Sequence, residues 1–121
     1  MREKLTQNFY RDEFACRCGC GFDTVDIRLV EGLQRLRDSL GGAPITINSA
    51  CRCVEHNRAV GGEANSQHLL GKAADIVVQG YRPGMVANAA NTIAEFAQGG
   101  IGNYTSFTHL DVRRGRARWN G

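Results

Sequence analysis

One stretch near the middle of the chain, SQHLLGKAADI (66–76), limits the folds that this sequence can adopt. A helix would rarely place Gly71 at its centre, because glycine there costs up to about 1 kcal/mol relative to alanine. The stretch then runs into the apolar, β-branched IVV, which is typical of a strand. We therefore expect a loop that folds back at Gly71 and enters a strand, with His68 in the loop and Asp75 at the start of the strand.

A second histidine-containing stretch, FTHLDVR (107–113), alternates apolar and polar residues and predicts another strand. If the two strands are neighbours, His68, Asp75 and His109 offer N, O and N donors to one metal ion. Three protein ligands leave a fourth position of a tetrahedral zinc open, which is typical of a hydrolytic site rather than a closed structural one. The alternative is that these side chains are scattered surface polar groups.

The rest of the chain predicts a single α+β domain over residues 1–121, with a small, mainly antiparallel sheet and two principal helices. Apolar residues recur at helical spacing after Asp23 and Thr24, either of which can cap the helix start, and Gly41-Gly42 ends it. The expected elements are helices over 24–40 and 82–97, a short helix or turn over 53–62, strands over 43–52, 73–80 and 106–113, a turn at 99–104 and a basic tail after residue 113.

Composition excludes several classes of protein. Hydrophobic residues make up 42% and charged residues 22% of the 121 residues, as in a globular protein. The net charge of +3 is far from a nucleic-acid-binding signature, and the basic residues do not alternate with aromatic ones. No apolar run reaches the ~18 residues of a membrane span. The start MREKLTQNFYRDEF lacks the apolar segment of a signal peptide, so we expect synthesis in the cytoplasm.

Five cysteines fall into two clusters, CRCGC and CRC. An odd number cannot be fully paired within one chain. Three interpretations stay open: reduced structural thiols, a second and purely structural zinc site, or a disulfide between the clusters. The C-x-C spacing is tighter than the usual C-x2-C of zinc sites, which disfavours the second interpretation. The residues concerned are Cys16, Cys18, Cys20, Cys51 and Cys53.

The wider pattern resembles the zinc D-alanyl-D-alanine carboxypeptidase superfamily, the M15 peptidases, whose fold is shared with the hedgehog signalling domain. The stretch INSACRCVEHNRAVGGEANSQHLLGKAADI is similar to the family pattern SGYRS…HN…VGG…S-x-H-x-x-G-x-A-x-D. GGIGNYTSFTHLDVR resembles the family's closing strand, and EFACRCGC resembles a compact, often phage-encoded branch. The resemblance covers about residues 14–113 and implies a hedgehog/DD-peptidase-like fold.

The resemblance also implies roles for individual residues. His68, Asp75 and His109 match the three zinc ligands of the family. Arg52 matches the arginine that binds the substrate carboxylate or stabilises the developing oxyanion, a task that suits a planar guanidinium. Ser66 and Gln67 would line the cleft and bind substrate.

The general base is the point at which this sequence departs from the family. Several members place Glu or His two or three residues before the last zinc ligand, where this chain has Phe107 and Ser106. Asp111 follows His109 by two residues, so on a strand both side chains point to the same face. Asp111 is therefore a candidate base or a partner that orients His109. Glu63 is a further candidate base.

The function implied is hydrolysis of peptide bonds in peptidoglycan stems by a monomeric zinc enzyme, either as a carboxypeptidase or as an endolysin-type endopeptidase. Such a phage or prophage hydrolase would reach the cell wall after release from the cytoplasm. The missing upstream base motivates an alternative: a non-catalytic zinc-containing module that binds peptidoglycan or protein. Neither function involves nucleic acid or insertion into a membrane.

Overall fold

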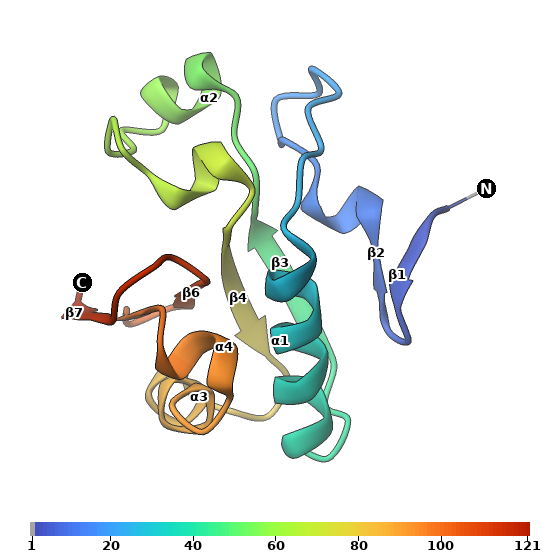
Figure 1. Ribbon diagram of the computed structural model, residues 1–121, viewed down its shortest axis with the longest axis vertical. Helices are drawn as coiled ribbons and strands as arrows, with labels where there is room; N and C mark the ends of the chain where they lie inside the picture. The colour runs from blue at the N-terminus through green and yellow to red at the C-terminus, as the bar shows by residue number, and fades with distance from the viewer. Residues whose placement is uncertain (1) are drawn as a thin grey trace.

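The computed structural model describes residues 2–121 and has the predicted α+β architecture (Figure 1). A five-stranded sheet has the order β3-β4-β6-β5-β7, in which β5 and β7 are parallel and the other neighbours antiparallel. The mainly antiparallel sheet is thus confirmed. Its strands are β3 (Ile45–Ser49), β4 (Ala73–Val78), β5 (Gly100–Asn103), β6 (Thr108–Asp111) and β7 (Ala117–Asn120).

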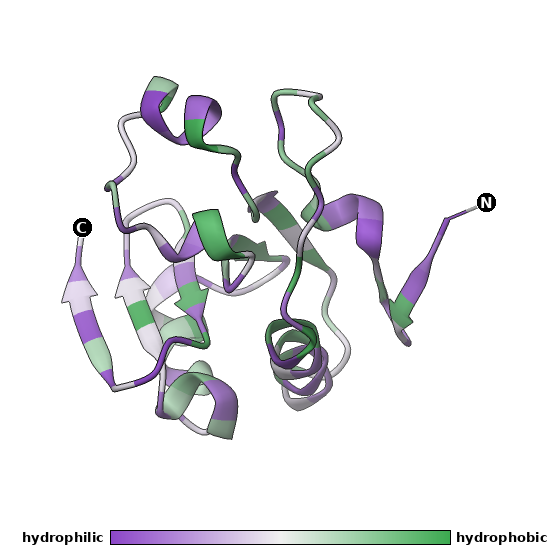
Figure 2. Cartoon of the chain, turned by 45° about the horizontal axis from the view of Figure 1, so that its top comes forward, coloured by the Kyte–Doolittle hydropathy of each residue, from purple (hydrophilic) through white to green (hydrophobic). Residues whose placement is uncertain are grey.

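The first principal helix, α1 (Ile27–Ser39), buries an apolar stripe. It begins later than Asp23 or Thr24, because Asp26 is the cap: its carboxylate accepts a hydrogen bond from the backbone N–H of Arg28 at 2.9 Å. Figure 2 shows hydrophobic and hydrophilic residues on different sides of this helix. The buried residues are Leu29, Val30, Gly32, Leu33 and Leu36.

The second predicted helix is wrong as a single element. The structure has α3 (Pro83–Ala90) and a short α4 (Ala94–Ala97). Between them Ile93 is extended, with φ −95° and ψ 117°, and its side chain is buried in the core. The chain changes direction at this break, and the side chains of Ile93 and Phe96 both lie in the core.

A small hairpin precedes α1 and was not predicted. It consists of β1 (Lys4–Thr6) and β2 (Phe9–Tyr10), followed by the 3-10 helix η1 (Arg11–Phe14). The carboxamide oxygen of Gln34 on α1 accepts hydrogen bonds from the Thr6 hydroxyl at 3.0 Å and the Asn8 backbone N–H at 2.9 Å. The hairpin is therefore fixed to the helix, and Phe9 and Phe14 enter the core.

The segment predicted as a basic tail contains a strand, β7. β7 pairs with β5, a strand in the stretch that the sequence predicted to be a turn. The glycines of β5 permit close packing: a Cβ atom at Gly100 would overlap the carboxylate of Asp111, and one at Gly102 would overlap the ring of Trp119. These two glycines therefore serve close approach within a sheet rather than a turn.

The register of the central strands sets up the functional site. Asp75 on β4 lies opposite His109 on β6, and Ala73 lies opposite Asp111. The short helix α2 (Val54–Ala59) and the 3-10 helix η2 (Gln67–Leu70) precede β4. Both lie near the end of the sheet at which β4 begins (Figure 1). None of the described helices combines the length and apolar character needed to cross a bilayer.

Candidate metal centre

The structure brings His68, Asp75 and His109 together, although they come from η2, β4 and β6. Asp75 Oδ1 lies 2.9 Å from His109 Nδ1 and 3.3 Å from His68 Nε2. Zinc bonds of ~2.0–2.1 Å in tetrahedral geometry separate neighbouring ligand atoms by ~3.3 Å. The donor set and its spacing therefore fit a zinc ion with only small movements of the side chains.

His68 is oriented by the backbone around it. Its Nδ1 lies 2.6 Å from the carbonyl oxygen of Ala50, and this contact turns Nε2 toward Asp75 and the centre. The Ser66 hydroxyl accepts a hydrogen bond from the His68 backbone N–H at 3.1 Å. Gly71 has φ +67°, and a Cβ atom there would overlap the carbonyl of Thr24. The fold-back expected at Gly71 thus packs against the segment that leads into α1.

Asp75 is a buried carboxylate that stays ionised. Burial opposes its ionisation, but hydrogen bonds from His109 and His68 hold the pKa of Asp75 well below its usual range. Its second oxygen, Oδ2, lies 3.5 Å from a guanidinium nitrogen of Arg52. One carboxylate oxygen is thus available to a cation in the centre while the other faces Arg52.

His109 lies between two carboxylates. Its Nε2 is 2.7 Å from Asp111 Oδ2, and its Nδ1 faces Asp75. Burial lowers the pKa of His109, but the hydrogen bonds with Asp111 and Asp75 outweigh it and raise the pKa above the usual value. Without a metal ion, a proton on Nδ1 of His109 lies between this ring and Asp75, where a divalent cation would bind. Nε2–H donates to Asp111 both with and without the metal.

Asp111 is placed behind His109, away from the cleft. Its side chain has no exposed surface. Besides His109, it accepts hydrogen bonds from the Gly100 backbone N–H at 2.9 Å and from the Arg113 guanidinium at 2.7 Å. A carboxylate whose oxygens are all occupied in this way cannot reach a substrate. Asp111 therefore lies where it can orient His109, and its role stays a prediction.

Arg52 is fixed at the edge of the centre. Its guanidinium donates to the side-chain oxygen of Asn57 at 3.1 Å and to the hydroxyl of Ser49 at 3.3 Å, and its backbone N–H donates to the carbonyl of His68 at 2.9 Å. A Cβ atom at Gly62 would overlap Asn57 and crowd this guanidinium. Glycine at position 62 therefore lets the segment 60–62 pass close to Arg52.

The centre opens into a cleft of about 760 Å³. Glu63 and the predicted substrate-binding residues Ser66 and Gln67 line the cleft. Glu63 and Asp75 are the carboxylates among the described residues that line the cleft. Other lining residues are Arg52, Val60, Gly61, Gly62, Asn65, His68, Tyr104, Phe107, His109, Arg113 and Trp119.

An aromatic wall of the cleft, formed by Tyr104, Phe107 and Trp119, was missed from the sequence. Tyr104 and Phe107 stack with ring centroids 4.4 Å apart, and the Trp119 indole N–H donates to the Tyr104 hydroxyl at 2.8 Å. Trp119 also packs against His109, with centroids 5.0 Å apart. The alternation in ARWN was the available signal, but the surrounding arginines made this segment resemble a solvated terminus.

Comparisons with known proteins agree with this geometry. A family model described as Peptidase M15 matches residues 7–111. A zinc D-Ala-D-Ala carboxypeptidase of Streptomyces albus G is 35% identical over 86 residues, which are 69% of this chain. The match spans about a third (34%) of the relative's own length. Because the family model covers most of the chain, including all three residues of the centre, the chain belongs to the Peptidase M15 family.

Proposed function

We propose that the protein is a zinc peptidase that hydrolyses peptide bonds in the stem peptides of bacterial peptidoglycan. The observation that carries this proposal is the convergence of His68 Nε2, Asp75 Oδ1 and His109 Nδ1 beside an open cleft. Membership of the Peptidase M15 family and the similarity to a zinc D-Ala-D-Ala carboxypeptidase support it.

The three donor atoms would hold the zinc ion and leave one coordination position facing the cleft. When bound, the ion supplies Lewis-acid activation of a carbonyl group and of water. The chain keeps the ligands in place: the Ala50 carbonyl holds the ring of His68, Arg52 faces the second oxygen of Asp75, and Asp111 holds the ring of His109. These contacts reduce the rearrangement that metal binding requires.

Arg52 is suited to an anionic group of the substrate. Its side chain is 15% exposed, so charge attraction is only weakly screened there. Arg113 is a second cation that lines the cleft. Stem peptides carry carboxylates and small aliphatic side chains, and the wall formed by Tyr104, Phe107 and Trp119 offers apolar contact to the latter. The two arginines are balanced by Glu63 and Asp75, so a bound zinc ion would give the cleft the net positive charge that suits a short anionic peptide.

Proton transfer is assigned to Glu63. It lines the cleft and is exposed, whereas Asp111 is buried and fully hydrogen-bonded. The loop that carries Glu63 is held in place, because the Asn57 amide donates to the Glu63 carbonyl at 2.9 Å. Glu63 would take a proton from the attacking water and pass it to the leaving amine.

Digestion of purified peptidoglycan tests the function directly. We expect the protein to release new amino groups, and mass spectrometry of the products to identify a cut within the stem peptide. A chelator should stop the release, and added zinc should restore it. Bound zinc without any released amine would contradict the proposal and favour a non-catalytic binding module. The nature of the cut decides between carboxypeptidase and endolysin-type endopeptidase action.

Two carboxylate variants separate proton transfer from orientation of the ligand. Glu63→Gln should lower kcat by about 10²–10⁴ while zinc affinity stays the same, because it removes only the base. Asp111→Asn should weaken zinc binding by about 10–100-fold, because His109 loses its ionised partner. Kinetics and zinc titration give both values, and Glu55→Gln on the exposed side of α2 is the control. Full activity of Glu63→Gln would remove Glu63 from the reaction.

A further inference from the structure

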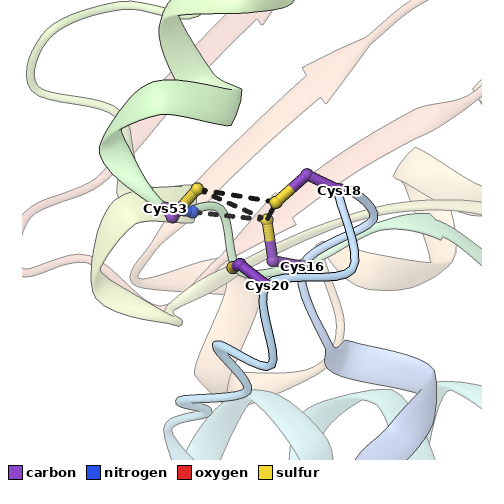
Figure 3. A group of neighbouring side chains, drawn as sticks. All are labelled: Cys16, Cys18, Cys20 and Cys53. Carbon is purple, nitrogen blue, oxygen red and sulfur yellow. Dashed lines mark hydrogen bonds between the residues drawn. The ribbon is translucent and has the colours of Figure 1, made fainter.

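A second set of potential ligands lies outside the cleft. Cys16, Cys18 and Cys20 come from the loop after η1, and Cys53 comes from the segment before α2. Their sulfur atoms all lie within 4.8 Å of one another (Figure 3). In Figure 1 this loop and α2 lie at the same end of the molecule. We call Cys16, Cys18, Cys20 and Cys53 the four-cysteine cluster.

The spacing of the sulfur atoms fits one metal ion. Sγ of Cys16 lies 3.5 Å from Sγ of Cys18 and 3.9 Å from Sγ of Cys53, and the last two are 3.7 Å apart. Tetrahedral zinc with Zn–S bonds of ~2.3 Å places its sulfur ligands ~3.8 Å apart. A disulfide would instead require ~2.05 Å. We propose that the four-cysteine cluster binds a second, structural zinc ion as a tetrathiolate.

Cys51, the fifth cysteine, is excluded from this site. Its thiol donates to the carbonyl oxygen of Phe22 at 3.2 Å, and it is 1% exposed. The five cysteines then divide into the four ligands of the four-cysteine cluster and Cys51, which lies in the core.

The surroundings of the cluster favour thiolates. The Cys53 backbone N–H points to Cys16 Sγ at 3.4 Å, and the His56 backbone N–H points to Cys53 Sγ at 3.4 Å. Both N–H groups stabilise negative charge on the sulfur atoms that they face. A zinc ion would stabilise that charge further, because its ligands are thiolates and not thiols.

Glycines allow the tight C-x-C-x-C spacing to surround one ion. Gly19 has φ +83° and Gly21 has φ +90°, conformations that strain other residues. The Cys16 backbone N–H donates to the Phe22 carbonyl at 2.7 Å and closes the loop. The residues between these two are all exposed, so the loop has little apolar packing of its own. A metal ion would supply the missing cross-link, as in other small zinc sites.

The proposed ion would connect the loop before α1 to the segment that carries Arg52. Arg52 lies between Cys51, which is anchored to Phe22, and Cys53, which is a ligand. Both contacts join this segment to the same loop. The ion would therefore support the position of Arg52 at the edge of the cleft without touching the substrate.

Cobalt replacement tests the site independently of peptidase activity. The full chain is purified under reducing conditions, freed of metal and titrated with Co²⁺. Cobalt bound to thiolates absorbs strongly in the near ultraviolet through charge transfer from sulfur, and the His–Asp–His centre contains no sulfur. We expect about one equivalent of cobalt to produce this absorption, and zinc to displace it.

Two cysteine variants locate the signal. Cys18 is exposed, so Cys18→Ser leaves the core intact; it should weaken cobalt binding and lower the sulfur-to-cobalt absorption, because one of the four thiolates is lost. Cys51→Ala should keep it, and His109→Ala should also keep it while losing zinc from the other centre. Elemental analysis should give about two zinc ions per chain for the wild type and about one for Cys18→Ser. Absence of the absorption in the wild type, an unchanged absorption and cobalt affinity in Cys18→Ser, or a disulfide found by mass spectrometry would each overturn the proposal.

Discussion

Replacing His109 by alanine is expected to abolish hydrolysis and to remove about one equivalent of bound zinc, because zinc at a catalytic site relies on three protein ligands. The loss should be severe, since His109 also keeps Asp75 and Asp111 apart on the buried side of the cleft. Without the ring, two ionised carboxylates face each other across a small cavity, and their repulsion disfavours the remaining ligand geometry. Zinc content and peptidoglycan hydrolysis are measured on the same preparation.

His56→Ala is the matched control, since His56 lies in α2 and does not line the cleft. It should keep both the zinc and the activity. Asp75→Asn provides a second test with nearly the same shape, and it should lose zinc as His109→Ala does. Full zinc occupancy in folded His109→Ala would contradict its role as a ligand.

Replacing Arg52 by alanine is expected to lower kcat/KM by about 10²–10³, the usual effect of removing a group that stabilises developing negative charge. Zinc should stay bound, because Arg52 faces the oxygen of Asp75 that does not face the histidines. Arg52→Lys should restore little of the loss. A lysine can pair with Asp75, but it cannot also keep the fork-shaped contacts with Asn57 and Ser49.

Arg58→Ala is the control for charge, because Arg58 is exposed on α2 and carries the same formal charge. It should change kcat/KM by less than about threefold, because Arg58 does not line the cleft. If Arg58→Ala and Arg52→Ala had equal effects, general electrostatic attraction of the substrate would replace a specific role for Arg52.

The central part of the fold could be predicted because local pattern and tertiary environment agree there. α1 has a regular apolar stripe, and β3, β4 and β6 alternate or carry β-branched residues. β5 and β7 could not be predicted in the same way. Gly100 and Gly102 are required by the side chains of Asp111 and Trp119, and such close packing is visible only after the sheet has formed.

The candidate site was predicted to different degrees for different residues. The three metal-binding side chains belong to a fixed motif, so the resemblance located them before the fold was known. The role of Asp111 depends on which nitrogen of the His109 ring it contacts. Strand alternation predicts only that the two side chains lie on the same face of the sheet, and not which ring atom is contacted. The aromatic wall depends on Trp119, whose strand is formed by pairing with β5 and not by a local preference.

The pairing of Asp75 with His109 across β4 and β6 has a consequence for refolding. If β6 slipped by one position, Leu110 would replace the imidazole, and His109 would turn to the opposite side. Only one alignment of these strands can therefore capture the ion. Zinc present during renaturation should select that alignment by mass action and raise the yield of correctly paired molecules, whereas metal-free renaturation lacks this discrimination.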